Sequence, residues 1–343
     1  MRILAALAVC CLLFAAGCAP QQKAEAPAKG DLKLVHADEP IGPIEPAVVT
    51  NAAKVDLGKM LFFEPRLSKS GFISCNSCHN LGLGGTDGLP SSIGHKWQLG
   101  PINSPTVLNA KYAVAQFWDG RAKDLVEQAG GPIANPGEMA SNHDLADRVL
   151  QSMPEYVALF KGVYGTDAIT IGQVQDAIAA FESTLVTPNS RFDKWLYGDD
   201  TALAAEEMEG YRLFKDKGCT TCHNGPAAGN GTFQKFGVYK PFETKASPQG
   251  RYDVTKNPDD RMVFKVPPLR NVQLTAPYFH DGSRWALGEA VQLMGELQLD
   301  AQLTPEETAK VVAFLKTLTG DQPQVTHPIL PPSNESTPKP VRI

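Results

Sequence analysis

The sequence has few cysteines and no strong excess of charge of either sign. Seven cysteines occur in 343 residues, and Cys10, Cys11 and Cys18 fall in the N-terminal signal region. The other four form two close pairs, so no cysteine of the mature chain is left over for a disulfide. The formal net charge of −5 gives no case for nucleic acid as a partner.

The sequence also lacks an apolar run long enough to cross a bilayer, and it lacks sustained period-two alternation. Its N-terminal apolar run covers only residues 3–16, whereas a transmembrane helix needs about 20 residues. Such a run after Arg2 is typical of an export signal, which we predict over residues 1–17. Because alternating strands are missing and helical spacing recurs, we expect a mostly α fold.

The end of the signal predicts how the exported chain is held. Ala15, Ala16 and Gly17 precede Cys18, which resembles the lipobox of bacterial lipoproteins, although Ala15 stands where leucine is usual. This pattern predicts a periplasmic protein anchored to the membrane through lipidated Cys18; the alternative is ordinary cleavage, with Cys18 lost or free. Residues 18–46 are rich in Ala, Pro, Gln and Lys, so we expect a flexible tether there.

Two motifs of the form Cys-x-x-Cys-His carry the main chemical signal. Cys75, Cys78 and His79 form the first, and the second has the same spacing. In c-type haem attachment the two thiols form thioether bonds to the porphyrin, and the histidine ligates iron. A zinc site or a thioredoxin-like pair would explain the cysteines, but not a histidine directly after both pairs. We therefore predict two covalent c-type haems, the second at Cys219, Cys222 and His223.

Helical patterns surround both motifs and indicate two domains. Residues 203–217, 141–161 and 170–185 have helical spacing, and Thr304, Pro305 and Glu307 mark the start of a helix that stops near Gly320. A proline, polar residues and a glycine interrupt the pattern over residues 188–198. We predict two cytochrome c-like domains with one haem each, over residues 47–190 and 191–343.

Several longer stretches resemble the bacterial dihaem cytochrome c peroxidases from about Val48 to the C-terminus. They are LGKMLFFEPRLS at 57–68, GPINSPTV at 100–107, FWDGRA at 117–122 and PYFHDG at 277–282, in the order of that family. The resemblance implies an enzyme that reduces hydrogen peroxide to water. It also implies a cytochrome c-type or similar electron donor, bound calcium and a homodimer.

The resemblance assigns different roles to the two haems. The N-terminal haem would be the peroxidatic, low-potential one, with His79 as proximal ligand and His95 as sixth ligand in the resting enzyme. The glycine-rich loop over residues 81–100 would let His95 swing away. The C-terminal haem would be the high-potential, electron-accepting one, with His223 and Met294 as ligands, since a thioether favours ferrous iron.

Further site residues also come from the resemblance. Glu138 matches the distal acid-base glutamate, Gln128 a distal polar residue, and Trp118 the tryptophan between the haems. The calcium ligands would be Asn103, Thr275 and Pro277, and the last two would bind through backbone carbonyls.

Two other functions are compatible with the same cofactors. A non-enzymatic electron carrier would hold two six-coordinate haems, but Glu138 beside a labile His95 argues against it. A dihaem enzyme that oxidises a partner protein, such as the methylamine-utilisation enzymes, would have tyrosine where Met294 stands and would lack the loop histidine. The two ligands present here favour the peroxidase.

Overall fold

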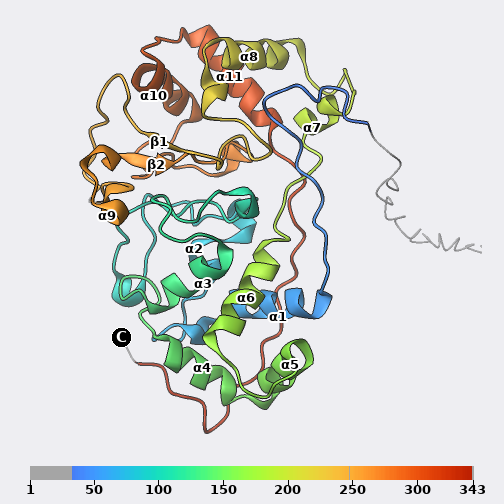
Figure 1. Cartoon of the computed structure of the whole chain (residues 1–343), viewed down its shortest axis with the longest axis vertical. Coiled ribbons are helices and arrows are strands. Elements are labelled where there is room, and N and C mark those ends of the chain that lie inside the picture. Colours follow the sequence, from blue (N-terminus) through green and yellow to red (C-terminus); the bar gives the residue numbers. More distant parts are fainter. Residues whose placement is uncertain (1–32, 247, 342–343) are drawn as a thin grey trace, which may run out of the picture. The chain divides into compact units, whose positions relative to one another are not determined.

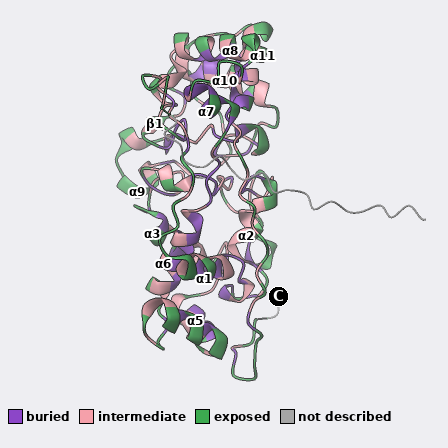
Figure 2. Cartoon of the chain, turned by 90° about the vertical axis from the view of Figure 1, so that its right-hand side faces the viewer, coloured by how far each residue is buried: buried purple, intermediate pink, exposed green. Residues whose placement is uncertain are grey.

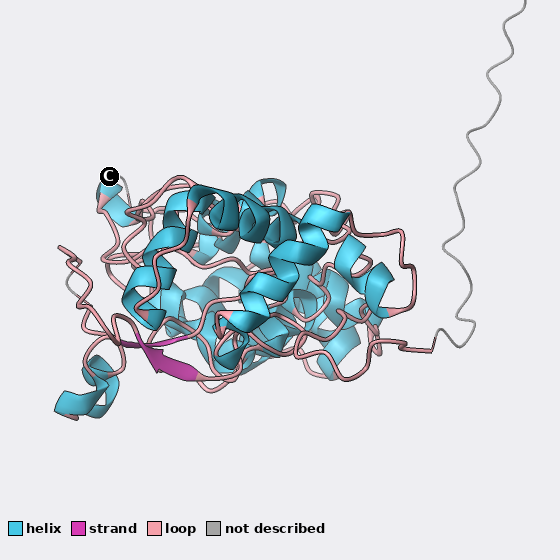
Figure 3. Cartoon of the chain, turned by 90° about the horizontal axis from the view of Figure 1, so that it is seen from above, coloured by secondary structure: helices cyan, strands magenta, loops and turns pink. Residues whose placement is uncertain are grey.

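The computed structural model describes residues 33–246 and 248–341. The predicted signal peptide, Cys18 and the first part of the expected tether, to residue 32, lie outside this range. The described chain is mostly helical, with one small two-stranded ribbon, as Figure 3 shows, so the predicted mostly α fold is confirmed. None of the helices in this range has the length and apolar character needed to span a bilayer.

The first core lies among five helices in the lower half of Figure 1. Leu57, Phe62, Ile133, Tyr156 and Ile178 are among its buried residues. These helices are α1 (Ala52–Phe62), α3 (Leu125–Ala134), α4 (His143–Gln151), α5 (Pro154–Tyr164) and α6 (Ile171–Glu182).

Local signals explain where these helices begin. Asn51, Asp124, Asn142 and Thr170 are N-caps whose side chains accept a hydrogen bond from the first turn. The helical pattern over residues 141–161 is divided into α4 and α5, because Pro154 cannot donate to a preceding carbonyl and so begins a new helix.

The second core lies in the upper half of Figure 1 and has its own buried aromatic cluster, so buried residues gather in both halves in Figure 2. Phe192, Tyr211 and Phe314 pack with ring centroids 4.8–5.6 Å apart. The expected capping box of Thr304 and Glu307 is present at the start of the last helix. The helices are α7 (Arg191–Leu196), α8 (Ala205–Asp216), α10 (Leu287–Leu299) and α11 (Pro305–Thr317).

Short elements connect these helices. The strands β1 (Phe233–Lys235) and β2 (Val263–Lys265) pair antiparallel, with Phe233 opposite Lys265. The remaining helical turns are α2 (Cys75–Cys78), α9 (Tyr252–Thr255) and the 3₁₀ turns Pro65–Leu67, Leu81–Leu83, His95–Trp97, Ala110–Tyr112, Cys219–Thr221, Pro258–Asp260 and Val272–Leu274.

Residues 34–46 depart from the expected flexible tether. Ile41 and Ile44 are only 0% and 2% exposed, and Ile41 belongs to the second core. The Val35 amide donates to the Leu196 carbonyl at 2.9 Å, and the Tyr211 hydroxyl donates to Glu39 at 2.6 Å. The composition is that of a linker, but the two isoleucines bury apolar surface and hold the segment against the second domain.

The C-terminal segment runs from the end of α11 down to the first domain and packs against it (Figure 1). Arg66 donates to the Pro331 carbonyl at 2.8 Å, and the Val341 amide donates to the Lys69 carbonyl at 3.0 Å. The sequence assigned all residues after 190 to the second domain, whereas this tail packs against the first domain.

Candidate haem sites

Each Cys-x-x-Cys-His stretch forms a single helical turn. The first turn is α2, where the Ser77 hydroxyl accepts a hydrogen bond from the Ser74 amide at 3.0 Å. The second is the 3₁₀ turn Cys219–Thr221. Gly218 directly precedes it with a φ of 86°, a conformation that favours glycine. Residues three apart share one face of such a turn, and all four thiols are free. Each pair can therefore form two thioether bonds to one porphyrin.

The two motif histidines are oriented in the same way. His79 Nδ1 lies 3.1 Å from the Pro105 carbonyl oxygen, and His223 Nδ1 lies 3.2 Å from that of Ala228. Burial lowers the pKa of both imidazoles, to about 4 for His223, so both are neutral at pH 7. A neutral ring that donates from Nδ1 keeps the lone pair of Nε2 for a metal, which is the arrangement of an iron ligand.

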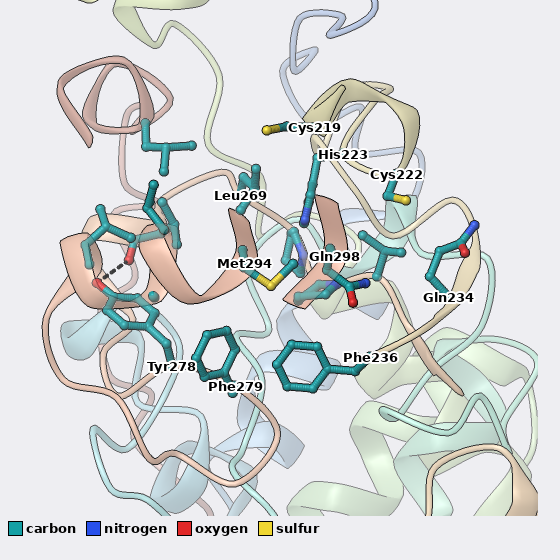
Figure 4. A pocket seen from close by; sticks show the side chains of 18 of the residues that line it. Cys219, Cys222, His223, Gln234, Phe236, Leu269, Tyr278, Phe279, Met294 and Gln298 are labelled. Atoms are coloured by element: carbon teal, nitrogen blue, oxygen red, sulfur yellow. Dashed lines mark hydrogen bonds between the residues drawn. The ribbon is translucent and has the colours of Figure 1, made fainter. Parts of the chain in front are cut away.

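The second motif borders an apolar cavity of about 400 Å³. Figure 4 shows His223 pointing into it between Cys219 and Cys222, while Met294 from α10 points in from another side. Apolar side chains such as Leu269 dominate the lining, and neither aspartate nor glutamate is among the residues that form it. This donor set fits a haem c, because two thiols, an imidazole and a thioether meet at one apolar cavity.

His95 and Glu138, the two predicted distal residues of the first haem, lie next to each other. The His95 amide donates to the Glu138 carbonyl at 2.8 Å, which joins the His95 loop to the segment after α3. His95 is 5% exposed, and its Nδ1 has no hydrogen-bond partner among the described residues. Lys96 and Trp97 after it have φ values of 57° and 61°, a conformation that side chains rarely adopt.

The Glu138 carboxyl has the environment of an acid-base group. Burial raises its pKa, while Arg121 and a hydrogen bond of 2.6 Å from the Asn135 amide partly oppose that rise. A carboxyl with a raised pKa holds and releases protons closer to neutral pH than an ordinary one. Gln128 lies half-buried on α3, the helix that leads to Asn135.

Trp118 lies between the two motifs. It lines the cavity of the second motif, and its indole Nε1 donates to the Asn103 carbonyl at 2.8 Å. Two residues further on, Pro105 faces His79. The tryptophan is therefore connected to both sites by a few bonds.

The three predicted calcium ligands come together at the same cavity. Asn103, Thr275 and Pro277 all line it, and the Asn103 amide nitrogen donates to the Leu89 carbonyl at 2.8 Å, which leaves the amide oxygen as an acceptor. Oxygen donors of this kind suit calcium. In the described part of the chain, no cluster of three or more histidine, cysteine or acidic side chains forms another metal site.

Two buried residues at these sites were not singled out from the sequence. His280, in the PYFHDG stretch, is 1% exposed and stacks on Phe264 with ring centroids 4.4 Å apart. Lys265 on β2 is 7% exposed and lines the second cavity. A lysine in a short strand reads as a solvated residue, and no sequence signal distinguishes this one.

Comparisons with known proteins agree with this geometry. Residues 52–201 match the family model of the Di-haem cytochrome c peroxidases, and residues 207–319 match that of Cytochrome c. Cytochrome c551 peroxidase of Nitrosomonas europaea is 62% identical over 306 residues, which are 89% of this chain and 92% of that protein. The Pseudomonas aeruginosa protein of the same name is 51% identical over 290 residues, 83% of this chain and 84% of that protein.

A solved structure has a similar fold. A MauG-like protein associated with microbial copper homeostasis matches with a TM-score of 0.71 and 28% identity, over 81% of this chain and 93% of that chain.

Proposed function

The chain belongs to the di-haem cytochrome c peroxidase family, and on that premise we propose how its residues share the reduction of hydrogen peroxide to water. The family, the two cytochrome c-type domains and the peroxidase function predicted from the sequence are confirmed by the comparisons. The roles of the individual residues, the calcium, the donor, the assembly and the location make up the proposal.

Glu138 moves the proton that makes water the leaving group. A haem held by Cys75, Cys78 and His79 would supply the redox-active iron at which peroxide is reduced. The Glu138 carboxylate accepts a proton from the oxygen nearer the iron and returns it to the outer oxygen, while Gln128 hydrogen-bonds the bound peroxide or water. The raised pKa of Glu138 supports this role, and such groups contribute about 10²–10⁴-fold to a rate.

His95 controls access to that site. In the resting enzyme its imidazole would help to hold the haem of the first motif, and its loop would move away once the second haem has been reduced. The left-handed backbone at Lys96 and Trp97 and the contact between His95 and Glu138 support a loop that can take two positions.

Trp118 and the predicted calcium ligands have their roles between the two haem sites. Trp118 would lie on the electron route between a haem held by His223 and Met294 and the haem held by His79. The Asn103 side chain and the Thr275 and Pro277 carbonyls would hold calcium, which would stabilise the active arrangement. The position of all these residues around one cavity supports both roles.

Met294 is the single observation that carries this choice of function. Its thioether points into the cavity that His223 enters, and this ligand pair suits a haem that accepts electrons (Figure 4). In a protein-oxidising relative a tyrosine would stand there. In a simple electron carrier, neither a labile His95 nor Glu138 would have a task.

The surroundings of the enzyme follow from the same proposal. It works in the periplasm, anchored through lipidated Cys18, which lies outside the described residues. A small c-type cytochrome or a similar donor supplies electrons, and two copies form a homodimer. The similarity to proteins named cytochrome c551 peroxidase supports the donor class, and the export signal supports the location.

Steady-state peroxide reduction, measured before and after one-electron reduction, tests the proposal. We expect turnover with a reduced c-type cytochrome as donor, together with visible spectra that show the first haem changing its ligation after that electron is added. A protein that takes up electrons but never turns over peroxide in either state would be a carrier.

A further inference from the structure

Lys265 is a buried cation at the end of β2. It is 7% exposed, and burial lowers the pKa of its ammonium to about 8. Its Nζ donates to the amide oxygen of Asn230 at 2.9 Å, and among residues 33–246 and 248–341 it forms no salt bridge. A buried ammonium group is costly unless an anion accompanies it, and one neutral amide does not supply that charge.

The protein offers Lys265 no counter-ion from within the second cavity. The residues that line this cavity include Lys217 and Lys265 but neither aspartate nor glutamate. Lys217 already pairs with Glu307 at 2.9 Å. Of these two lysines, Lys265 is therefore the one whose charge is available to pair with an anionic ligand in the cavity.

The ligand that fits this cavity brings the missing charge. The cavity carries the attachment cysteines and axial ligands of a haem c, and a haem carries two propionate carboxylates in addition to its iron. Carboxylates and ammonium groups form charge-assisted hydrogen bonds that are stronger than neutral ones.

We propose that Lys265 binds a propionate of the haem attached at Cys219 and Cys222, and that this ion pair helps to set the potential of that haem. The inference rests on the proposed assignment of this haem to the second cavity. The Lys265 amide donates to the Trp118 carbonyl at 2.8 Å, and β2 lies between α10 and the helices of the first core in Figure 1. The pair thus holds the haem edge beside the proposed electron relay.

The positive charge of Lys265 should raise the reduction potential of the second haem. A positive charge that neutralises a propionate favours ferrous over ferric iron, because the reduced haem carries one positive charge fewer. Without Lys265 the buried propionate would have no partner, and its pKa would rise toward neutral pH. The potential of the second haem would then fall as pH increases and the propionate loses its proton.

Replacing Lys265 in the holoenzyme separates charge from fold. We expect Lys265→Met to lower the ratio of reduced to oxidised second haem at a fixed ambient potential by about tenfold at pH 8, which corresponds to about 59 mV for one electron. Between pH 5 and 8 the variant should gain a pH-dependent potential. Lys265→Arg should restore the original potential and its flat profile.

A matched control lies on the neighbouring strand. Lys235 on β1 is exposed, so Lys235→Met removes the same charge from the same ribbon and should leave the potential unchanged. If Lys265→Met keeps the wild-type potential and pH profile while spectra show His223 and Met294 still bound, Lys265 does not hold a propionate. Loss of those ligands in the unmodified protein would instead contradict the haem assignment itself.

The unmodified holoenzyme gives a second test that depends on no variant. Paired with a propionate, Lys265 keeps its proton well above pH 8, so the potential of the second haem should stay level from pH 7 to 9. A potential that falls through about pH 8 would show an unpaired Lys265 losing its charge and would overturn the proposal. Burial lowers the pKa of His280 across the cavity, so this histidine titrates below that range. Other charged or titratable groups close to β2 include Lys235 opposite Val263, Arg251, whose amide donates to the Val263 carbonyl, and Lys217, His223 and Tyr278, which line the same cavity.

Discussion

The indole Nε1 of Trp118 donates to the backbone carbonyl of Asn103 at 2.8 Å, and this bond ties the tryptophan to the segment that orients His79. Trp118 also lines the second cavity, and its ring meets Phe264 and His280 edge-on. One side chain thus contacts the surroundings of both haem sites, in a chain where each site has its own core.

Trp118→Phe should slow electron transfer between the haems. Phenylalanine keeps an aromatic ring but cannot donate to Asn103, so the link to the first site is lost. Stopped-flow measurements should show that the second haem is reduced at the normal rate and that the first haem is reduced more slowly. Trp285→Phe is the matched control, since Trp285 is 59% exposed and lies outside the His95 loop. Unchanged transfer in Trp118→Phe would remove Trp118 from the route.

His95→Gly should open the first haem without prior reduction, because it removes only the blocking ligand. The oxidised enzyme should become partly high-spin in visible spectra and react with peroxide at once. Lys256→Gly is the control, since Lys256 is exposed with a φ of 58° that glycine adopts freely and lies outside the His95 loop. A His95→Gly protein that stays low-spin and inert would show that another group holds the sixth position.

Met294→His should lower the potential of the second haem and block activation. Imidazole favours ferric iron relative to a thioether, so donors would reduce this haem poorly. A redox titration measures the change, and the potential of the first haem serves as internal reference. An unmoved potential would mean that Met294 is not the ligand.

Glu138→Gln should slow peroxide cleavage by about 10²-fold or more, while ligation and both potentials stay nearly the same. The amide has the shape of the acid but cannot shuttle a proton. In the unmodified enzyme turnover should fall as pH drops through the raised pKa of Glu138, because the carboxylate is the form that accepts the proton. Glu155→Gln, on the exposed side of α5, should turn over normally. Normal turnover in Glu138→Gln would leave Gln128 or water to carry the proton.

The sequence was most informative where chemistry is local. Cys-x-x-Cys-His needs one helical turn, and the capping box at Thr304 needs four consecutive residues, so both could be predicted and both are present. The packing of Ile41 and the return of the tail to Arg66 could not, because they depend on contacts between distant segments. The burial of Lys265 is missed for the same reason.

The buried carboxyl of Glu182 makes the stability of the fold depend on pH. It ends α6 and is 5% exposed, and its Oε2 has no hydrogen-bond partner among the described residues. Burial alone raises its pKa to about 8, so the folded protein holds this carboxyl protonated at pH 6.

Glu182→Gln should therefore make the free energy of unfolding less dependent on pH. In the unfolded chain the glutamate has a pKa of about 4.3, so between that pH and about 8 the folded state binds one more proton and loses stability as pH rises. From pH 6 to 8 the unmodified protein should lose roughly 2–3 kcal/mol relative to Glu182→Gln, whose amide resembles the neutral acid at every pH. Urea unfolding of both holoproteins at the two pH values measures this difference. Glu335→Gln, an exposed site in the C-terminal tail, should follow the unmodified protein. Parallel pH profiles for Glu182→Gln and the unmodified protein would mean that Glu182 is ionised in the folded state.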